Sequence, residues 1–258
     1  MHIEVRGSGP PLVMLHGWAM HGGVFAPLVD RLQSRFELHL VDLPGHGRSR
    51  ESAVPLELSA IAAEVAARTP PAAWLGWSLG GLVALHAAQL LSGSVQSLLM
   101  LCASPCFVRA AGWPHGMDAS VFHGFAADLQ RDYAATIDRF LLLEAQGSDH
   151  LREDIRLLRQ QVFAFGQPRP ASLLDGLARL QDSDLRGGLP SLSMPSLWIA
   201  GRRDRLVSSA SMEQAAQLSG GRFLCIEHGG HAPFLTHADE VADAIADALA
   251  RVMAATAP

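Results

Sequence analysis

The sequence contains no lysine, so all 20 of its basic side chains are arginines. Its 25 acidic residues outnumber them and give a formal net charge of −5, which argues against the basic surface of a nucleic-acid-binding protein. Charged residues make up only 17% of the chain, whereas hydrophobic residues reach 49%. A chain of 258 residues with this balance excludes global disorder and can build one large core with room for an insertion.

Cysteines and long apolar runs are also scarce. The three cysteines, Cys102, Cys106 and Cys225, are too few for a disulfide framework and form no C-x-x-C pair. No apolar run approaches the roughly 18 residues of a membrane-spanning helix, and the N-terminal residues lack the apolar segment of a signal peptide. We therefore expect a cytoplasmic protein with no membrane partner.

Short apolar runs alternate with helical patterns along most of the chain. This alternation, with strands that are apolar throughout, predicts an α/β fold with a mostly parallel, doubly wound sheet. The predicted strands are residues 11–16, 36–42, 73–77, 95–103, 195–200 and 222–227. The predicted helices between them are residues 24–34, 58–69, 79–91, 209–218 and 238–253.

The alternation is interrupted once, between residues 112 and 185. This stretch shows only helical patterns, separated by Gly147 and by residues 166–170. The predicted helices there are residues 121–135, 137–146, 150–163 and 171–180. We expect residues 112–185 to form a helical cap over the carboxyl ends of the strands, and residues 1–111 and 186–258 to form the core.

The segment 76–81, Gly-Trp-Ser-Leu-Gly-Gly, carries the first chemical signal. It follows an apolar run and precedes a helical pattern, which is the strand–turn–helix context of a nucleophile elbow. Small residues at positions 76 and 80 leave room for such a tight turn. An ordinary Gly-Ser turn is the alternative, but the context favours Ser78 as a nucleophile exposed at a helix N-terminus.

A serine nucleophile needs a base, and the base needs an acid that orients it. Asp204 and His231 each follow a predicted strand, in the order Ser, acid, His that this type of fold uses. Asp204 alone is equally compatible with a solvated turn residue, and His228 lies three residues from His231. The two glycines before His231 favour it over His228. A metal site at this H-x-x-H spacing is not expected, because no other ligands lie nearby.

The oxyanion of acyl transfer requires two N–H donors. The backbone N–H groups of Leu79, directly after the nucleophile, and of Trp18, in the loop after an early strand, are the candidates. Trp18 is also compatible with ordinary core packing. His16 is better explained as a structural residue, and residues 42–49 form an irregular loop without a phosphate-binding motif, to which we assign a scaffold role.

Together these motifs resemble the α/β-hydrolase superfamily over nearly the whole chain, cap included. Within it, the sequence is most similar to the pimeloyl-[acyl-carrier protein] methyl ester esterases of biotin synthesis. The resemblance rests on residues 16–20 (His-Gly-Trp-Ala-Met), 75–84, 139–141 (Arg-Phe-Leu) and 231–234 (His-Ala-Pro-Phe).

The resemblance implies hydrolysis of the methyl ester on a carrier-bound acyl chain through an acyl-enzyme on Ser78, with no cofactor and no metal. It also implies substrate contacts from nine residues, namely Trp18, Ser78, Leu79, Phe140, Leu141, Leu142, Leu143, Glu144 and His231. The chain departs from the family pattern in having Glu144 where a glutamine is usual, and Ala135 where a second arginine is frequent.

Arginines of the predicted cap suggest a partner surface. Arg152, Arg156 and Arg159 lie at i, i+4 and i+7, on one face of a helix. Pairing of Asp149 with Arg152 and of Glu153 with Arg156 would instead make this a solvated helix face, and the sequence leaves both interpretations open. The resemblance implies that these three residues and Arg139 contact an acidic acyl carrier protein.

Two other functions remain compatible with the same motifs. A general carboxylesterase or lactonase for short free esters would use the same three catalytic residues. A non-catalytic, ligand-sensing protein of this fold is less compatible with an intact set of Ser78, Asp204 and His231. In each case we expect a monomer.

Overall fold

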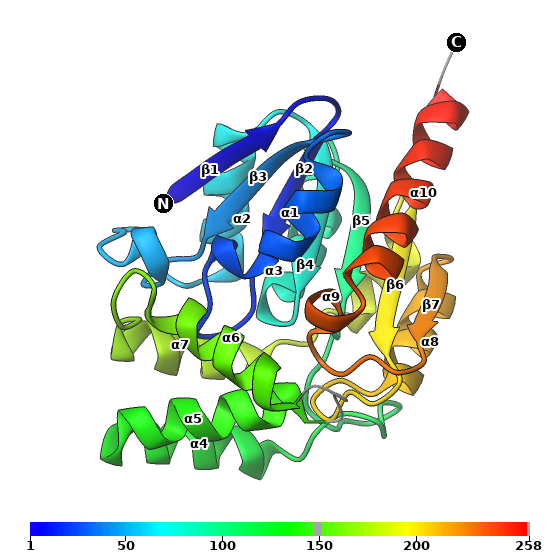
Figure 1. Cartoon of the computed structure of the whole chain (residues 1–258). Helices are drawn as coiled ribbons and strands as arrows, with labels where there is room; N and C mark the ends of the chain where they lie inside the picture. Colours follow the sequence, from blue (N-terminus) through cyan, green and yellow to red (C-terminus); the bar gives the residue numbers. More distant parts are fainter. Residues whose placement is uncertain (147–150, 257–258) are drawn as a thin grey trace.

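The structure, a computed structural model, describes residues 1–146 and 151–256, and the statements below concern these residues. Seven strands form one sheet in the order β1-β3-β2-β4-β5-β6-β7 (Figure 1). Only β1 is antiparallel to its neighbour, and all other pairs are parallel, as a doubly wound sheet requires. The strands are β1 (His2–Gly7), β2 (Pro11–Leu15), β3 (Glu37–Asp42), β4 (Ala72–Trp77), β5 (Val95–Leu101), β6 (Ser196–Gly201) and β7 (Arg222–Ile226).

Helices cover both faces of the sheet. The helices α1 and α10 pack together on one face, whereas α2, α3 and α8 lie on the other (Figure 1). The core helices are α1 (Ala26–Leu32), α2 (Leu58–Arg68), α3 (Leu79–Leu90), α8 (Ser209–Leu218), α9 (Pro233–Thr236) and α10 (Ala238–Thr256), with 3-10 turns η1 (Gly22–Phe25), η2 (Gly47–Ser49) and η3 (Arg186–Ser191). None of the helices within the described ranges is long and apolar enough to cross a membrane.

The six predicted strands are present within two residues of their expected ends, but the prediction missed β1. Its residues alternate between polar and apolar, as in His2, Glu4 and Arg6 against Ile3 and Val5. Such alternation is typical of an edge strand, and β1 is half-buried from His2 to Glu4 and exposed from Val5 to Gly7. It contrasts with β4 and β6, which are buried along their whole length and therefore apolar or small throughout.

Four helices lie between β5 and β6, beneath the carboxyl ends of the strands (Figure 1). They are α4 (Ala119–Arg131), α5 (Tyr133–Ala145), α6 (Leu151–Phe163) and α7 (Pro170–Asp182). The prediction that one helix runs to residue 135 was wrong. That helix ends at Arg131 because Asp132 begins the next one, where its carboxylate accepts a hydrogen bond from Ala135 N at 3.0 Å. Gly147 and His150, parts of the predicted cap, lie outside the described residues.

The segment between α6 and α7 attaches the cap to the core. The ring of Phe165 contacts the imidazole of His21, with 4.9 Å between the ring centroids, and the guanidinium of Arg48 lies 4.8 Å from its centre. The N–H of Arg169 donates to Gly45 O at 2.9 Å. Gly45 has a φ of +79°, and a Cβ there would lie 1.9 Å from the Ser172 hydroxyl, so only glycine allows α7 to approach this closely.

Candidate active site

Ser78 occupies the sharp turn between β4 and α3. Its backbone has φ 53° and ψ −120°, a conformation that L-residues rarely adopt. The glycines around it are required for space: a Cβ at Gly76 would lie 2.4 Å from Gly80 O, and one at Gly80 would lie 2.2 Å from Leu15 O. The turn therefore has the strained geometry of a nucleophile elbow.

Asp204 and His231 meet at the same edge of the sheet. His231 Nδ1 lies 2.8 Å from Asp204 Oδ2, and both side chains are fully buried. The other carboxylate oxygen of Asp204 accepts hydrogen bonds from the N–H groups of Leu206 and Val207 at 2.7 and 3.0 Å. His231 Nε2 has no hydrogen-bond partner among the described residues, so it is available to a serine hydroxyl. The alternative base, His228, is instead exposed and contacts Arg203.

Close packing of the loops after β6 and β7 brings this pair together. A Cβ at Gly201 would lie 2.1 Å from Gly230 O, so the loop that carries His231 lies directly against the end of β6. Arg203 N donates to Gly229 O at 2.9 Å. The indole N–H of Trp77, the residue before the elbow serine, donates to His231 O at 2.8 Å. These contacts fix the imidazole relative to β4 and hence to Ser78.

The loop after β2 lies against the elbow. A Cβ at Gly17 would lie 3.2 Å from Ser78 Cβ, which places the Trp18 N–H close to the serine. This N–H donates to no residue that the structure describes. Leu79 is the first residue of α3, so its N–H has no acceptor within the helix. Both predicted oxyanion donors are therefore unengaged beside Ser78.

The Trp18 side chain connects this loop to the cap. Its indole is fully buried and donates to Leu173 O on α7 at 2.8 Å. Its ring meets that of Phe140 edge to face, with 4.5 Å between the centroids. Trp18 thus packs in the core and lies between the elbow and the cap, so the two sequence interpretations describe the same side chain.

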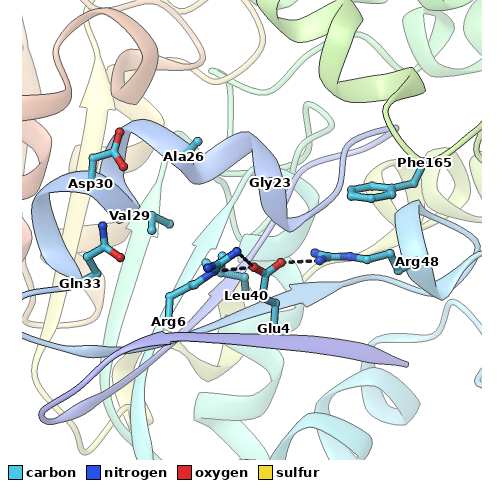
Figure 2. A pocket seen from close by; sticks show the side chains of 10 residues that line it. All are labelled: Glu4, Arg6, Gly23, Ala26, Val29, Asp30, Gln33, Leu40, Arg48 and Phe165. Atoms are coloured by element: carbon cyan, nitrogen blue, oxygen red, sulfur yellow. Dashed lines mark hydrogen bonds and ion pairs between the residues drawn. The ribbon is translucent and has the colours of Figure 1, made fainter.

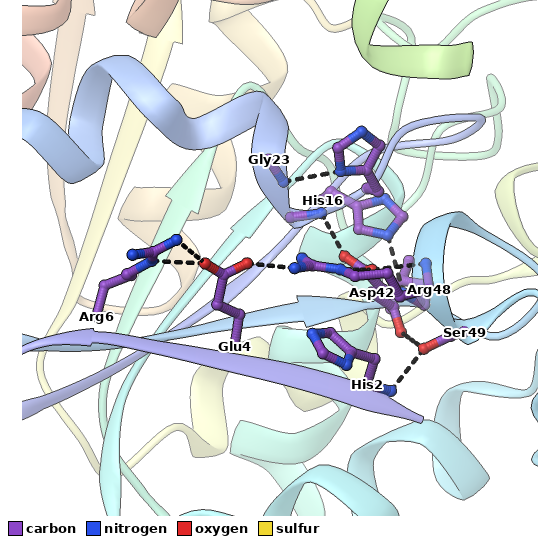
Figure 3. Close-up of polar contacts among 11 residues, drawn as sticks. His2, Glu4, Arg6, His16, Gly23, Asp42, Arg48 and Ser49 are labelled. Atoms are coloured by element: carbon purple, nitrogen blue, oxygen red, sulfur yellow. Dashed lines mark hydrogen bonds and ion pairs between the residues drawn. The ribbon is translucent and has the colours of Figure 1, made fainter. Parts of the chain in front are cut away.

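His16 supports the neighbouring loop, residues 42–49 (Figure 3). Its Nε2 accepts a hydrogen bond from Leu43 N at 2.9 Å, and its Nδ1 lies 2.7 Å from Gly17 O. Burial, reinforced by the nearby His46, lowers the pKa of His16 to about 3, so it is neutral at physiological pH. A buried neutral imidazole with both nitrogens engaged is a structural residue.

Asp42 ties the same loop together. It is fully buried and accepts hydrogen bonds from Gly22 N at 2.8 Å and from Arg48 N and Nε, both at 2.9 Å. Arg48 also pairs with Glu4, which in turn pairs with Arg6 (Figures 2 and 3). A groove of about 350 Å³ lies beside this chain of charges, between β1 and α1. Because both of its arginines are already ion-paired, the network stabilises the loop, in line with the scaffold role.

The predicted substrate-contacting segment of α5 has a buried side and an exposed side. Phe140, Leu141 and Glu144 are buried. Leu142 is 49% exposed and, with Leu143, lines a groove of about 500 Å³ on the outer side of the cap. The structure therefore places Phe140 with Trp18, whereas it places Leu142 on the opposite surface, away from Ser78.

The four cap arginines are exposed, but two of them are paired. Arg139 pairs with Asp128, and Arg159 pairs with Asp138 at 3.0 Å. Arg152 and Arg156 form no ion pair with any residue in the described ranges, so the expected partner Glu153 does not hold Arg156. Asp149, the other expected partner, lies outside the described residues.

Comparison with known proteins agrees with this geometry. Residues 10–238 match the family model described as the alpha/beta hydrolase fold. The chain is 58% identical over 245 residues to a pimeloyl-[acyl-carrier protein] methyl ester esterase from Stenotrophomonas maltophilia, covering 95% of this chain and 94% of that protein. It is 55% identical over 253 residues to a protein of the same name from Xanthomonas oryzae, covering 98% and 100%. The chain belongs to the pimeloyl-[acyl-carrier protein] methyl ester esterase family, within the α/β hydrolases.

Solved structures share the fold of this family member. An esterase from Exiguobacterium antarcticum superposes with a TM-score of 0.87 at 23% identity, covering 98% of this chain and 95% of that one. The enol-lactonase of Burkholderia xenovorans superposes with a TM-score of 0.84 at 18% identity, covering 96% of both chains. At these identities the likeness establishes the fold and no more.

One residue near the predicted catalytic triad of Ser78, Asp204 and His231 was not singled out in the sequence of this family member. Cys102 directly follows β5 and has a φ of 43°, and its thiol lies 3.7 Å from Gly230 O in the histidine loop. Burial, and then the charge of Asp204, raise the pKa of this thiol well above its ordinary value, so it remains a neutral packing group and does not compete with Ser78 as a nucleophile. The position of Cys102 at the carboxyl end of a parallel strand was the available signal.

His228 and His231 have the H-x-x-H spacing of some metal ligands. Within residues 1–146 and 151–256, the structure contains no group of three or more His, Cys, Asp or Glu side chains suited to holding a metal ion. The spacing of His228 and His231 places one imidazole on the surface and the other in the core.

Proposed function

We propose that this chain is a serine carboxylesterase that converts the methyl ester of pimeloyl-[acyl-carrier protein] to pimeloyl-[acyl-carrier protein] and methanol, a step of biotin synthesis. The observation that carries the proposal is the buried Asp204–His231 pair, whose free Nε2 lies at the edge of the sheet where Ser78 forms a strained elbow. Identities of 55–58% over nearly the full length of relatives with this name support the choice of substrate.

The first half of the reaction forms an acyl-enzyme. His231 Nε2 takes the hydroxyl proton of Ser78 as Oγ attacks the ester carbonyl, and Asp204 stabilises the imidazolium through Nδ1–H. The N–H groups of Leu79 and Trp18 hold the oxyanion. The C–O bond to the methoxy group then breaks, and methanol leaves with the proton returned by His231.

The second half restores the enzyme. His231 takes a proton from water, the resulting hydroxide attacks the acyl carbonyl, and Ser78 Oγ leaves with the proton that His231 donates. Every proton transfer uses the same imidazole, so these steps call for no metal or cofactor. The three residues come from one chain, and we infer that the enzyme acts as a monomer.

The division of labour in the chain follows from this mechanism. Residues 1–111 and 186–258 form the catalytic core, and residues 112–185 form a cap that covers it. The buried Phe140, Leu141 and Glu144 contribute substrate contacts from the cap, whereas Leu142 and Leu143 line the groove on its outer side. Arg139, Arg152, Arg156 and Arg159 contact the acidic acyl carrier protein, and the exposure of all four guanidinium groups supports this role.

Methanol release from pimeloyl-carrier methyl ester tests the proposal. The assay compares the native chain and Ser78→Ala on the carrier substrate and on a short free methyl ester. Rapid turnover of the carrier ester, lost in Ser78→Ala, is the expected result. Turnover of the free ester alone would keep the serine mechanism but remove the carrier protein, leaving a general carboxylesterase.

A further inference from the structure

Glu144 on α5 is a buried acid that nothing in the described structure satisfies. Its side chain is 1% exposed, and neither Oε1 nor Oε2 has a hydrogen-bond partner among the described residues. A buried polar group without a partner costs about 1–3 kcal/mol, and more when it is charged. In a ligand-binding site, a buried polar group without a protein partner can form its hydrogen bond with the ligand.

The position of Glu144 on its helix directs it toward the catalytic centre. Glu144 and Phe140 are four residues apart and so lie on the same face of α5. Phe140 packs against Trp18 of the loop beside Ser78, and Leu142, on the opposite face, is exposed. The negative charge of Asp204 also acts on Glu144 through space. The carboxyl group therefore lies on the side of the cap that faces the triad.

The surroundings of Glu144 favour its uncharged form. Burial, and then the charge of Asp204, raise the pKa of Glu144 well above its ordinary value. Asp204 is itself bound to His231. On the neighbouring helix α4, Asp128 is paired with Arg131 and Arg139. On α5 itself, Asp138 pairs with Arg159. The helix α6 contributes the buried Asp154 and several exposed arginines. None of the arginines in the described ranges pairs with Glu144.

We propose that Glu144, one of the substrate contacts given above, makes this contact as an uncharged acid that donates its O–H to an oxygen of the ester bound at Ser78. The proposal deepens the serine esterase function and rests on it. An ionised Glu144 has no proton to donate, and its charge repels the oxyanion that forms at Ser78. Turnover therefore requires a neutral imidazole at His231 and a protonated carboxyl at Glu144, and the second requirement produces a fall in activity at alkaline pH.

The test measures kcat and KM for methyl butyrate by methanol release from about pH 6 to about pH 10. The variants are Glu144→Gln, a neutral donor of the same shape, and Glu144→Leu, which is neutral but cannot donate. Glu153→Gln, an exposed glutamate of the cap, is the matched control. We expect the alkaline fall of the native enzyme to disappear in Glu144→Gln and to persist in Glu153→Gln. Glu144→Leu is expected to lose roughly ten-fold in kcat/KM, mainly through KM, at every pH.

Two outcomes overturn the proposal. An alkaline fall in Glu144→Gln equal to the native one means that Glu144 does not titrate in the reaction. Activity in Glu144→Leu equal to that of Glu144→Gln means that no hydrogen bond to substrate is made. Thermal unfolding curves show whether both variants fold. If Glu144→Leu does not fold, the pH profile of Glu144→Gln still shows whether Glu144 titrates in the reaction.

A separate readout distinguishes this proposal from the function on which it rests. Labelling of Ser78 by a fluorophosphonate, together with turnover of methyl butyrate, reports the serine mechanism independently of Glu144. If the native chain shows neither the labelling nor the turnover, the proposed serine esterase function itself is refuted. Infrared difference spectra of native enzyme and Glu144→Gln at neutral pH are expected to contain the carbonyl band of one protonated carboxyl group, and its absence overturns the assignment of the uncharged acid.

Discussion

In the proposed mechanism, Asp204 holds His231 in the tautomer that accepts the proton of Ser78. One oxygen of Asp204 accepts two backbone N–H bonds, and the other faces His231 Nδ1. Nδ1 therefore carries the proton, and Nε2 has a lone pair available for Ser78.

Asp204→Asn is expected to preserve the fold and reverse this tautomer. The amide oxygen can keep the bonds from Leu206 and Val207, which turns the NH₂ group toward His231 and leaves Nε2 protonated. We expect kcat to fall roughly 10⁴-fold with little change in thermal stability. The measurement is ester turnover beside a melting curve, with the exposed Asp182→Asn as control. A loss below ten-fold would contradict the assigned role.

Buried histidines make the stability of the fold sensitive to acid. Burial lowers the pKa of His46 to about 4, and that of His16 lies near 3. Both values are below the ordinary value near 6.5, so the unfolded chain binds protons more readily than the folded one. Their contribution to stability is complete above about pH 6.5 and is lost as the pH falls toward 4.

We expect the urea midpoint of the native chain to decline between about pH 6.5 and about pH 5. His46→Gln retains a donor for Pro44 O but does not titrate, so its decline is expected to be shallower. His123→Gln, a change at an exposed histidine of α4, should follow the native curve. Parallel curves for native chain and His46→Gln would show that His46 does not contribute to the acid sensitivity.

At the scale of elements, the joint between α7 and the loop after β2 determines the shape of the site. A Cβ at Gly176 would lie 2.7 Å from Trp18 Cδ1 and 3.3 Å from Leu79 Cδ2. Trp18 and Leu79 supply the two proposed oxyanion donors. A larger side chain at position 176 of α7 would therefore displace Trp18 and, with it, the loop that carries the proposed Trp18 N–H donor.

Gly176→Ala and Gly124→Ala form a matched pair of helix substitutions. Alanine favours a helix by about 1 kcal/mol over glycine, and a Cβ at Gly124 meets nothing within 4 Å. Gly124→Ala is thus expected to raise stability slightly with unchanged kcat. Gly176→Ala is expected to lower kcat on a small ester about ten-fold or more, because misplacement of an oxyanion donor weakens transition-state binding. Equal kcat values in the two variants would show that the Trp18 contact is not used.

The elements themselves followed from the sequence wherever one pattern dominated. Continuous apolar runs predicted six of the strands, and their parallel arrangement brings Ser78, Asp204 and His231 to one edge. The alternating pattern of β1 was too short to separate from a polar N-terminus, and Asp132 was overlooked as a helix cap. The burial of Glu144 depends on how α5 packs against the core across a long insertion, which no local pattern encodes.

At the scale of the whole molecule, the cap as a whole holds more acidic residues than arginines, but α6 presents to the proposed carrier two arginines that are unpaired within the described ranges. Arg152 and Arg156 project from α6 without an ion pair among the described residues, on a protein whose net charge is −5. A cationic face on an acidic protein orients an acidic carrier and speeds its association.

The double variant Arg152→Ala/Arg156→Ala is expected to lower kcat/KM for the carrier ester roughly ten-fold at low salt. Added salt should reduce the native rate on the carrier ester and narrow this difference. The rate on methyl butyrate should be the same in both proteins, and Arg251→Ala on α10 is the control. An equal loss on both substrates would indicate damage to the cap and not a lost partner contact.

Ser78 is only 3% exposed, and His231 and Trp18 are fully buried, so the catalytic centre is shielded from solvent. An ester can therefore reach Ser78 only in molecules in which the side chains that cover it have moved aside. The apparent dissociation constant is therefore the intrinsic constant divided by the fraction of molecules that are open. Each 1.4 kcal/mol that favours the shielded form weakens apparent binding about ten-fold. The packing that keeps water away from Ser78 thus also raises the substrate concentration at which half of the enzyme is occupied.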